Sequence, residues 1–288
     1  MRIAILGASG NIGRSLAAYY SLDGGNKLFL FGRSASKIAS VFDQCNISTT
    51  GTIASYDDFS QHDYDIIINC IGISDPGNLI SGGNDILKIT EEFDNLVISY
   101  ISSKPQTKYI FMSSGAVYGT EFSAAVNAKS KFSIAVNNIP ANSFYSLSKL
   151  YAEAKHRSLS EYNIVDIRVF GFVSKYVDIE SKLFISDLAN SVKNKKVLNT
   201  GEATFVRDYV SANEIAELIN CICQSAEKNF AVDVLSARSV EKFQLLDGIK
   251  KEFNVDYEID GGFKSINSTG NKNLYYSAYK KAEEIGYK

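Results

Sequence analysis

The amino-acid sequence predicts an α/β protein built on a doubly wound parallel sheet. Short apolar strand patterns alternate with helical patterns over the first 168 residues. The strand patterns are apolar on both faces, which requires helices to cover both sides of the sheet. The glycine-rich and polar motifs follow directly after these strands, and ligands of such sheets bind beyond the carboxyl ends of the strands.

Each element is predicted from its local pattern. The first helix follows Leu6 and a glycine-rich turn, and Asp23-Gly24-Gly25 supplies the turn chemistry that ends it. The long central helix is closed by Pro105, which cannot continue a helix. We expect strands at 2–6, 27–31, 48–54, 65–71, 108–112 and 164–168, and helices at 11–21, 86–103 and 144–162.

The alternation breaks down after Arg168. Residues 171–200 mix loop and helix patterns, 212–224 form a helix, 230–235 a late strand, and the polar tail ends in a helix over 276–285. We therefore expect a larger unit from residues 1–172 plus 203–237. A smaller, intertwined C-terminal lobe would comprise residues 173–202 plus 238–288.

Composition narrows the classes of partner. With 45% hydrophobic and 22% charged residues the chain resembles ordinary globular proteins. The net charge of -2 argues against nucleic acid or an anionic membrane as the main partner. The longest apolar stretch, 66–73, is too short to span a bilayer, and Met1 leads directly into a strand pattern without a signal segment. A cytoplasmic location is expected.

Cysteine and histidine usage gives no indication of a metal site. The chain has four cysteines and two histidines, in neither a disulfide framework nor a zinc-binding spacing. Cys221 and Cys223 lie in an apolar helical run, which favours buried free thiols. No metal is predicted.

Glycines between the first strand and the first helix predict a dinucleotide site of the Rossmann type. Gly7 allows a sharp turn out of the strand, and Gly10 allows the backbone to approach a pyrophosphate at the helix N-terminus. Gly13 lets the helix pack closely on the sheet. The spacing, G-x-x-G-x-x-G, differs from the general G-x-G-x-x-G fingerprint, so its place after the first strand carries the prediction.

The end of the second strand bears on the choice of coenzyme. NAD sites commonly carry an acid there, bonded to the ribose 2′-hydroxyl. This chain has Arg33 instead, and a guanidinium can bind a 2′-phosphate in a bidentate manner. NADP is therefore favoured, with NAD as a possibility and a plain surface arginine as the alternative. The predicted coenzyme contacts are Gly7, Ser9, Gly10, Asn11, Ile12, Gly13, Arg33, Ser34, Ile53, Cys70, Ile71, Gly72, Tyr145 and Lys149.

Ser114, Tyr145 and Lys149 can move the proton that accompanies hydride transfer. Tyr145 and Lys149 are about one helical turn apart and share a face. A nearby ammonium and a positively charged nicotinamide both favour the phenolate of a tyrosine, whose ordinary pKa is about 10. Tyr145 would then give or take the proton while Ser114 orients the substrate oxygen.

Taken together, these motifs resemble the extended short-chain dehydrogenase/reductase family, in its nucleotide-sugar epimerase/dehydratase/reductase branch. Tyr-x-x-x-Lys occurs four times in the chain, but only the pair at Tyr145 has the family's order and context. The resemblance covers nearly the full chain. It rests on Gly7-x-x-Gly10-x-x-Gly13, Ser114-Gly-Ala-Val-Tyr118-Gly119, Tyr145-x-x-Ser148-Lys149 with Glu153, Thr204-Phe-Val-Arg207-Asp208-Tyr209-Val210, and the ending 280–287.

The resemblance implies substrate-binding roles for Ser114, Tyr118 and Arg207. Arg207 matches the arginine that binds the diphosphate of a nucleotide sugar, with an ion pair to a neighbour as the alternative. Tyr118 would line the sugar pocket, or else be a packed aromatic at a strand end. The larger unit would bind the dinucleotide and the lobe the substrate. Relatives often form homodimers through a helix pair that would include 144–162.

Several positions depart from the family pattern. Val169-Phe170-Gly171 stands where an asparagine usually contacts the nucleotide sugar, and Gly51-Thr52-Ile53 where an aspartate commonly meets adenine. Thr90 replaces a helix asparagine, and the loop 73–83 is unusual. These departures bear on the substrate rather than on the fold.

Three functions remain open. Dehydratases of this branch carry Thr-Asp-Glu at the Ser114 segment, whereas this chain has Ser114-Gly115-Ala116, so elimination is not expected. The favoured hypothesis is NADPH-dependent reduction of a nucleotide-linked 4-keto-sugar with Tyr145 as proton donor. The alternatives are a nucleotide-sugar 4-epimerase with tightly bound NAD and, from another class, a coenzyme-binding regulator.

Overall fold

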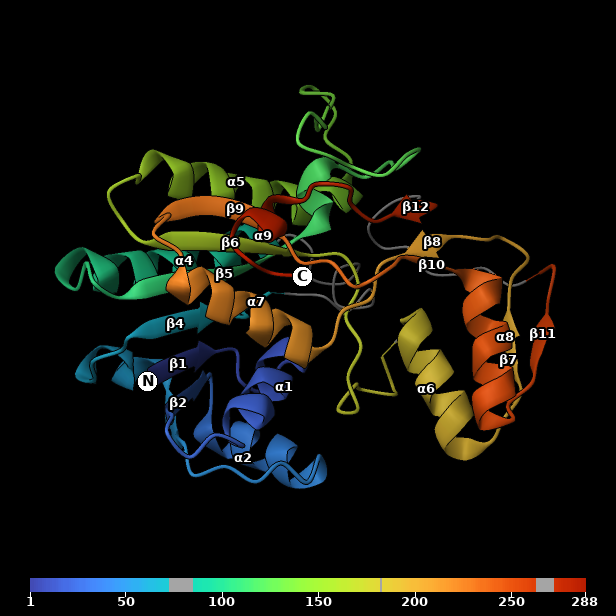
Figure 1. Ribbon diagram of the computed structural model, residues 1–288, viewed down its shortest axis with the longest axis horizontal. Helices are drawn as coiled ribbons and strands as arrows, with labels where there is room; N and C mark the ends of the chain where they lie inside the picture. Colours follow the sequence, from blue (N-terminus) through green and yellow to red (C-terminus); the bar gives the residue numbers. More distant parts are fainter. Residues whose placement is uncertain (73–84, 182, 263–271) are drawn as a thin grey trace.

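A seven-stranded parallel sheet forms the centre of the molecule (Figure 1). The computed structural model describes residues 1–72, 85–181, 183–262 and 272–288. The strand order is β3-β2-β1-β4-β5-β6-β9. The strands are β1 (Arg2–Leu6), β2 (Lys27–Gly32), β3 (Thr52–Ser55), β4 (Ile66–Asn69), β5 (Lys108–Ser114), β6 (Ile164–Val169) and β9 (Asn229–Asp233).

The strand order reverses direction between β1 and β4. From β1 the chain adds β2 and β3 on one side, then returns to add β4, β5, β6 and β9 on the other. Such a reversal opens a crevice beyond the carboxyl ends of the two central strands. The doubly wound α/β fold predicted from the sequence is confirmed.

Helices cover both faces of this sheet. One face packs against α1 (Asn11–Tyr20), α2 (Ala35–Gln44) and α7 (Ala212–Gln224), and the other against α4 (Ile86–Ser103) and α5 (Phe144–Ser158). Within β1, Ile3 and Ile5 enter the first core while Ala4 and Leu6 enter the second. This two-residue alternation between two cores explains why the strands are apolar throughout.

A smaller lobe lies beside the sheet, on the right of Figure 1. It contains α6 (Phe184–Asn194), α8 (Lys242–Phe253) and the parallel pair β7 (Leu198–Thr200) and β11 (Tyr257–Ile259). Its core is built on Leu188, Leu198 and Leu246. A three-stranded sheet comprises β10 (Val240–Glu241), β8 (Val206–Arg207) and β12 (Leu274–Tyr275).

The end of the chain packs on the large core. The last helix, α9 (Lys281–Glu284), contacts β9, and Ala282 and Tyr287 belong to the core that includes α1 and α7. The division at 1–172 plus 203–237 and 173–202 plus 238–288 stays a prediction. The contacts of Ala282 and Tyr287 favour assigning the last residues to the larger unit.

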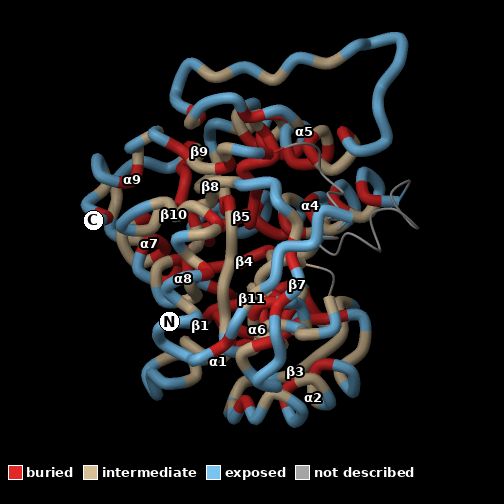
Figure 2. The backbone as a smooth tube through the Cα atoms, turned by 90° about the vertical axis from the view of Figure 1, so that its right-hand side faces the viewer, coloured by how far each residue is buried: buried red, intermediate tan, exposed pale blue. Residues whose placement is uncertain are grey.

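Two helices of the structure, α2 (Ala35–Gln44) and α8 (Lys242–Phe253), were not predicted from the sequence. Helix α2 begins after Ser34, whose side chain accepts a hydrogen bond from the Lys37 amide at 3.4 Å, and α8 follows a similar cap at Glu241. Both helices are short and largely exposed (Figure 2), so few of their residues belong to a core-facing stripe. Among the described residues, no helix is long and apolar enough to cross a membrane.

Candidate active site

The glycine loop after β1 has the geometry of a phosphate cradle. Gly7 adopts φ +75°, and its amide donates to the Phe31 carbonyl at 3.0 Å. A Cβ atom at Gly13 would lie 2.3 Å from the Gly7 carbonyl oxygen, so α1 can approach the turn only with glycine at this position. This close approach directs the N-terminus of α1 at the loop, where its amides favour an anion.

Arg33 and Ser34 follow β2 at the same edge of the sheet. Arg33 is exposed, whereas the Ser34 hydroxyl caps α2. Ser34 therefore has a structural role that is visible in the fold, and Arg33 is the freer of the two to meet a ligand.

Ile53, at β3, stays a predicted coenzyme contact, and the structure adds Tyr56 as a neighbour of the glycine loop. Ile53 pairs with Leu30 inside the sheet and packs against the core, two residues before the strand ends. Tyr56 stands just beyond the end, with its ring 4.5 Å from that of Phe93. Burial raises the pKa of Tyr56 to about 12, opposed by a hydrogen bond from the Gly7 backbone and by the charge of Arg33. Tyr56 is thus the residue that borders the coenzyme loop at this strand.

The turn after β4 lies between the glycine loop and Lys149, the lysine of the predicted catalytic set. The Cys70 amide donates to the Leu6 carbonyl at 3.0 Å, and the Ile71 amide donates to Asn69 at 3.0 Å. A Cβ atom at Gly72 would lie 3.6 Å from Lys149 Nζ. The predicted unusual loop 73–83 lies outside the described residues.

Lys149 is held in the interior below the end of β5. Its Nζ donates to the Met112 carbonyl at 2.8 Å and lies 4.3 Å from the centre of the Phe111 ring. The residue is 3% exposed, and burial lowers the pKa of its ammonium to about 8. A carbonyl and an aromatic face are the partners that keep a buried ammonium hydrogen-bonded and stabilised.

Ser114 and Tyr145 come together at the carboxyl end of β5. Ser114 is the last residue of β5, and its Oγ accepts a hydrogen bond from the Ala116 amide at 3.2 Å. Burial raises the pKa of Tyr145, and a side-chain hydrogen bond with Ser114 opposes this rise. The predicted Ser-Tyr-Lys set therefore converges at the end of β5.

The competing Tyr-x-x-x-Lys pairs have other partners. Lys104 pairs with Asp63, and Lys280 pairs with Glu283 at the surface. Tyr151 donates to Glu91 at 3.2 Å on the exposed side of α5. None of these contacts reaches Ser114.

Tyr118 belongs to a buried polar network rather than to an open pocket wall. Its hydroxyl accepts from Arg168 at 2.8 Å and donates to Asp233 at 3.1 Å. Arg168 also binds Glu153, and Ser277 donates to Asp233 at 2.5 Å. These contacts favour the alternative in which Tyr118 is a packed strand-end aromatic; its role in substrate binding stays a prediction.

Arg207, Lys272 and Tyr275 lie together at the small three-stranded sheet, and Tyr275 reaches Ser114. Arg207 on β8 and Tyr275 on β12 are direct partners in the strand pairing, and the guanidinium lies 5.2 Å from the ring centre. Lys272 Nζ lies 4.3 Å from the same ring. Burial and the charge of Arg207 lower the pKa of Lys272 to about 7. Neither cation belongs to an ion pair within the described part of the chain.

Lys272 and Tyr275 were not predicted from the sequence. The polar tail around them has no periodic pattern, and nothing local separates Lys272 from other lysines. Only the pairing of β12 with β8 brings both beside Arg207.

The departure from the family pattern after Arg168 places an aromatic ring in this region. Phe170 lies so close to Gly115 that a Cβ atom there would be 2.5 Å from the ring. With Phe122, Val126 and Tyr275 it forms a small apolar cluster. The wall near Ser114 is therefore aromatic where the family pattern has an asparagine.

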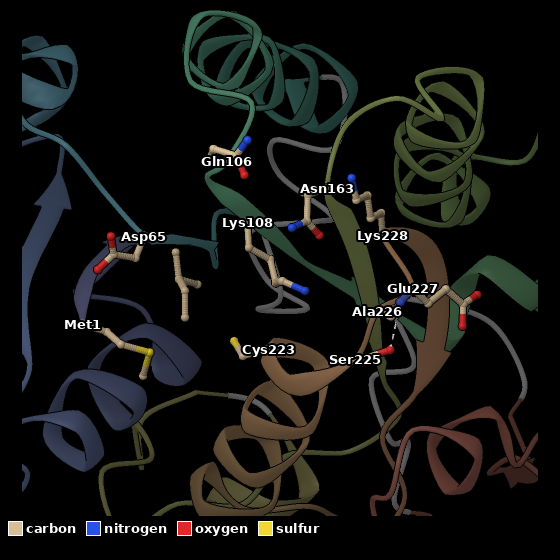
Figure 3. Close-up of a pocket in the computed structure, with 11 residues that line it drawn as sticks. Met1, Asp65, Gln106, Lys108, Asn163, Cys223, Ser225, Ala226, Glu227 and Lys228 are labelled. Carbon is tan, nitrogen blue, oxygen red and sulfur yellow. Dashed lines mark hydrogen bonds between the residues drawn. The ribbon is translucent and has the colours of Figure 1, made fainter.

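A cavity of about 360 Å³ lies at the opposite end of the sheet (Figure 3). Met1, Asp65 and Lys108 line it, and they stand at or just before the starts of β1, β4 and β5. Ligands of doubly wound sheets bind at the carboxyl ends, so this cavity is separate from the candidate active site.

Comparison with known families identifies the chain. The model of the NAD dependent epimerase/dehydratase family matches residues 3–234. The chain belongs to this family. A search of curated protein sequences finds no match.

Solved structures share the fold at low sequence identity. A UDP-N-acetylglucosamine 4-epimerase from Methanobrevibacter ruminantium M1, in complex with UDP-N-acetylmuramic acid, is 17% identical with a TM-score of 0.77 over 100% of this chain and 92% of that one. A UDP-glucuronic acid 4-epimerase from Bacillus cereus, with UDP-glucuronic acid and NAD, is 17% identical with a TM-score of 0.77 over 100% and 94%. A dTDP-glucose 4,6-dehydratase from Bacillus anthracis str. Ames, with NAD, is 15% identical with a TM-score of 0.74 over 99% and 90%.

Proposed function

We propose that this member of the family transfers a hydride between a nicotinamide coenzyme and a sugar carbon of a nucleotide-linked sugar. The convergence of Ser114 and Tyr145 above buried Lys149 carries the proposal. The glycine loop fits a dinucleotide, since a Cβ atom at Gly13 would overlap the Gly7 carbonyl. The bound coenzyme would supply or accept the hydride.

Tyr145 would exchange the proton at the oxygen of the reacting carbon. Its phenol must lose a proton to act as a base. Burial raises the pKa of this phenol, and Ser114 lowers it by stabilising the phenolate. Lys149 adds a positive charge on the same face of α5. The glycine and alanine after Ser114 supply no carboxyl group, so elimination of water is not part of the proposal.

Arg207 and Lys272 would bind the diphosphate of the substrate. Lys272 is buried and Arg207 is half-buried, and the charge of Arg207 helps to lower the pKa of Lys272. An anion bound between the two cations would offset this repulsion. Binding would then raise the pKa of Lys272, and a proton would be taken up near neutral pH. The enthalpy of substrate binding, measured by calorimetry, is therefore expected to vary with the ionisation enthalpy of the buffer.

Two finer versions of this function have separate support. Epimerisation with retained NAD is supported by the shared fold of 4-epimerases, one of them with bound NAD. Reduction with NADPH is supported by Arg33 at the end of β2. We place epimerisation first, because none of the three compared structures is a reductase. A homodimer through the helix at 144–162, which the family resemblance suggests, would be compatible with the exposed Leu150 of α5.

One experiment separates these versions. The purified protein is examined for retained NAD and then incubated with UDP- and dTDP-linked sugars, with and without NADPH. Interconversion of two sugars without net coenzyme consumption supports epimerisation, whereas stoichiometric NADPH oxidation with a keto-sugar supports reduction. Coenzyme binding without turnover of any sugar would support the regulator.

The substitution Tyr145→Phe tests the proposed chemistry directly. Turnover is expected to fall about 100-fold or more, since general acid–base catalysis contributes roughly that factor. Coenzyme and UDP binding should persist. Tyr151→Phe, on the exposed side of the same helix, is the matched control and should leave turnover unchanged. Full activity in Tyr145→Phe would remove this residue from the mechanism.

A further inference from the structure

Tyr275 brings a third hydroxyl group to the catalytic serine. The two oxygen atoms, Tyr275 Oη and Ser114 Oγ, are 3.2 Å apart although 161 residues separate them in the chain. Tyr275 is 5% exposed. A buried phenol without a partner would be costly, so this contact to Ser114 satisfies it.

The ring of Tyr275 is fixed from several sides. It packs 4.9 Å from Phe122 in an edge-on arrangement and 5.0 Å from Phe170. Arg207 and Lys272 both lie within reach of its π system. Moving the ring away from Ser114 would break all four contacts. This favours a Tyr275 hydroxyl that stays on the serine over a side chain that blocks the substrate site and moves out on binding.

The hydrogen bonds around Ser114 constrain its single proton. A serine hydroxyl has two acceptor lone pairs and one donor hydrogen. The Ala116 amide occupies one lone pair, and a donating Tyr275 would occupy the second. The serine proton is then free for another acceptor, and Tyr145 is the phenol whose ionisation Ser114 favours.

We propose that Tyr275 is a positioning residue for the proposed reaction, donating to Ser114 so that the Ser114 proton is directed at the Tyr145 oxygen. The inference rests on the proposed roles of Ser114 and Tyr145. Without the Tyr275 hydroxyl, Ser114 regains a free lone pair and can accept from Tyr145 instead of donating to it. The phenolate of Tyr145 then loses a donor, and the neutral phenol gains an acceptor.

The charges facing the cluster remain when only the hydroxyl is removed. Tyr275→Phe keeps the ring, its packing on Phe122 and Phe170 and both cation contacts. Arg207 of β8 and Lys272 before β12 lie over the Tyr275 ring, and Asp233 of β9 acts on the ionisation of Tyr275. Lys149 of α5 binds the Met112 carbonyl, two residues before Ser114. None of them is altered by the substitution, so a shift in the titration of Tyr145 reports the lost hydrogen bond.

The test follows the ionisation of Tyr145 by ultraviolet difference absorbance, with NAD present and absent. The Tyr145 titration is obtained by subtracting the curve of Tyr145→Phe, and in the Tyr275→Phe background by subtracting that of the double variant. A hydrogen bond to a charged group corresponds to roughly 1–2 pH units, so the midpoint should rise by about one unit or more in Tyr275→Phe. Tyr118→Phe, whose hydroxyl contacts Arg168 and Asp233, is the control and should not shift it.

A double-substitution cycle decides whether the effect passes through the serine. Ser114→Ala alone should raise the midpoint, and adding Tyr275→Phe should then change nothing. An unchanged midpoint in Tyr275→Phe, or an equal shift with and without Ser114, overturns the proposal. This titration needs no substrate, so its failure is distinguishable from failure of the proposed function, which would show as absent coenzyme binding and turnover.

With an active substrate, the kinetic result should agree. Tyr275→Phe is expected to lower kcat about tenfold at neutral pH with KM unchanged, and the loss should shrink at higher pH where the phenolate forms without assistance. A lower KM with unchanged kcat would show that Tyr275 blocks the substrate site, contrary to the proposal.

Discussion

Arg33 is the residue on which the choice of coenzyme depends. It follows β2 directly and is exposed, and its charge lies near Tyr56 beside the glycine loop. A bidentate contact with a 2′-phosphate contributes about 1.5–3 kcal/mol, or roughly a 10- to 100-fold difference in affinity. Arg33→Ala is therefore expected to weaken NADPH at least about tenfold while leaving NADH nearly unchanged, as measured by fluorescence titration.

The control for this substitution lies at the other end of the same strand. Lys27 is exposed at the start of β2, far from the coenzyme edge, and Lys27→Ala should alter neither affinity. Equal losses for NADPH and NADH in Arg33→Ala would refute the 2′-phosphate role and leave NAD as the coenzyme.

His156 makes the stability of the fold depend on pH. It is fully buried between Asp94 and Asp166, with ring-to-carboxylate distances of 2.7 and 2.6 Å. Burial alone would lower the pKa of the imidazole, but the two carboxylates outweigh it and raise the pKa to about 9. A histidine with a raised pKa in the folded state stabilises fully below its unfolded pKa of about 6.5, and this contribution is lost as pH rises through 9.

Urea unfolding at pH 6 and pH 9.5 measures this contribution. The wild type should lose about 3 kcal/mol between these pH values relative to His156→Gln, which cannot titrate. His62→Gln, at a histidine that forms no ion pair within the described residues, should keep the wild-type slope. The same slope in His156→Gln would place the origin of the pH dependence elsewhere.

At the scale of elements, the glycine loop and α1 pack so closely that only glycine fits at position 13. A Cβ atom at Gly13 would meet backbone atoms of Gly7 and Ala8, which cannot rotate away. Gly13→Ala is expected to displace α1 from the loop, lowering the free energy of unfolding by about 1–3 kcal/mol and abolishing coenzyme binding. Chemical denaturation and calorimetric titration with NAD provide the two readouts.

Gly24→Ala is the matched control for this substitution. No atom lies within 4 Å of a Cβ placed at Gly24, so the change should stay within about 0.5 kcal/mol. Retained NAD affinity in Gly13→Ala would mean that the loop does not hold the pyrophosphate.

The elements that the sequence predicts well are those with one dominant physical signal. Central strands are apolar on both faces because each alternates between two cores, and α4 begins and ends at the predicted residues, 86 and 103. The sequence places Ser114 at the carboxyl end of a strand, and Tyr145 and Lys149 on one face of the following helix; their catalytic roles stay predictions. Tyr56 and Tyr275 were missed because strand register places them, and register across a distant pairing leaves no local pattern.

At the scale of the whole molecule, the lobe has a core separate from the two cores of the large sheet. The sheet carries the glycine loop and the proposed catalytic residues, and the lobe core is built on Leu188, Leu198 and Leu246. Strands β8 and β12 bring Arg207 and Tyr275 to the catalytic end of β5 through the contact with Ser114. The lobe core is much smaller than the cores on the sheet, so it should open at a lower free energy.

Leu246→Ala tests this division. Leu246 is 2% exposed in the lobe core, and truncating such a residue costs about 2–5 kcal/mol. We expect hydrogen exchange to accelerate over 184–200 and 242–259 while β1 and β5 keep their protection. NAD affinity should persist, whereas UDP affinity should fall because Arg207 and Lys272 depend on the strands beside the lobe.

Leu218→Ala in α7, which belongs to the large core, should instead accelerate exchange throughout the sheet. Acceleration spread equally over both parts in Leu246→Ala would show one cooperative unit and contradict the division proposed from the sequence.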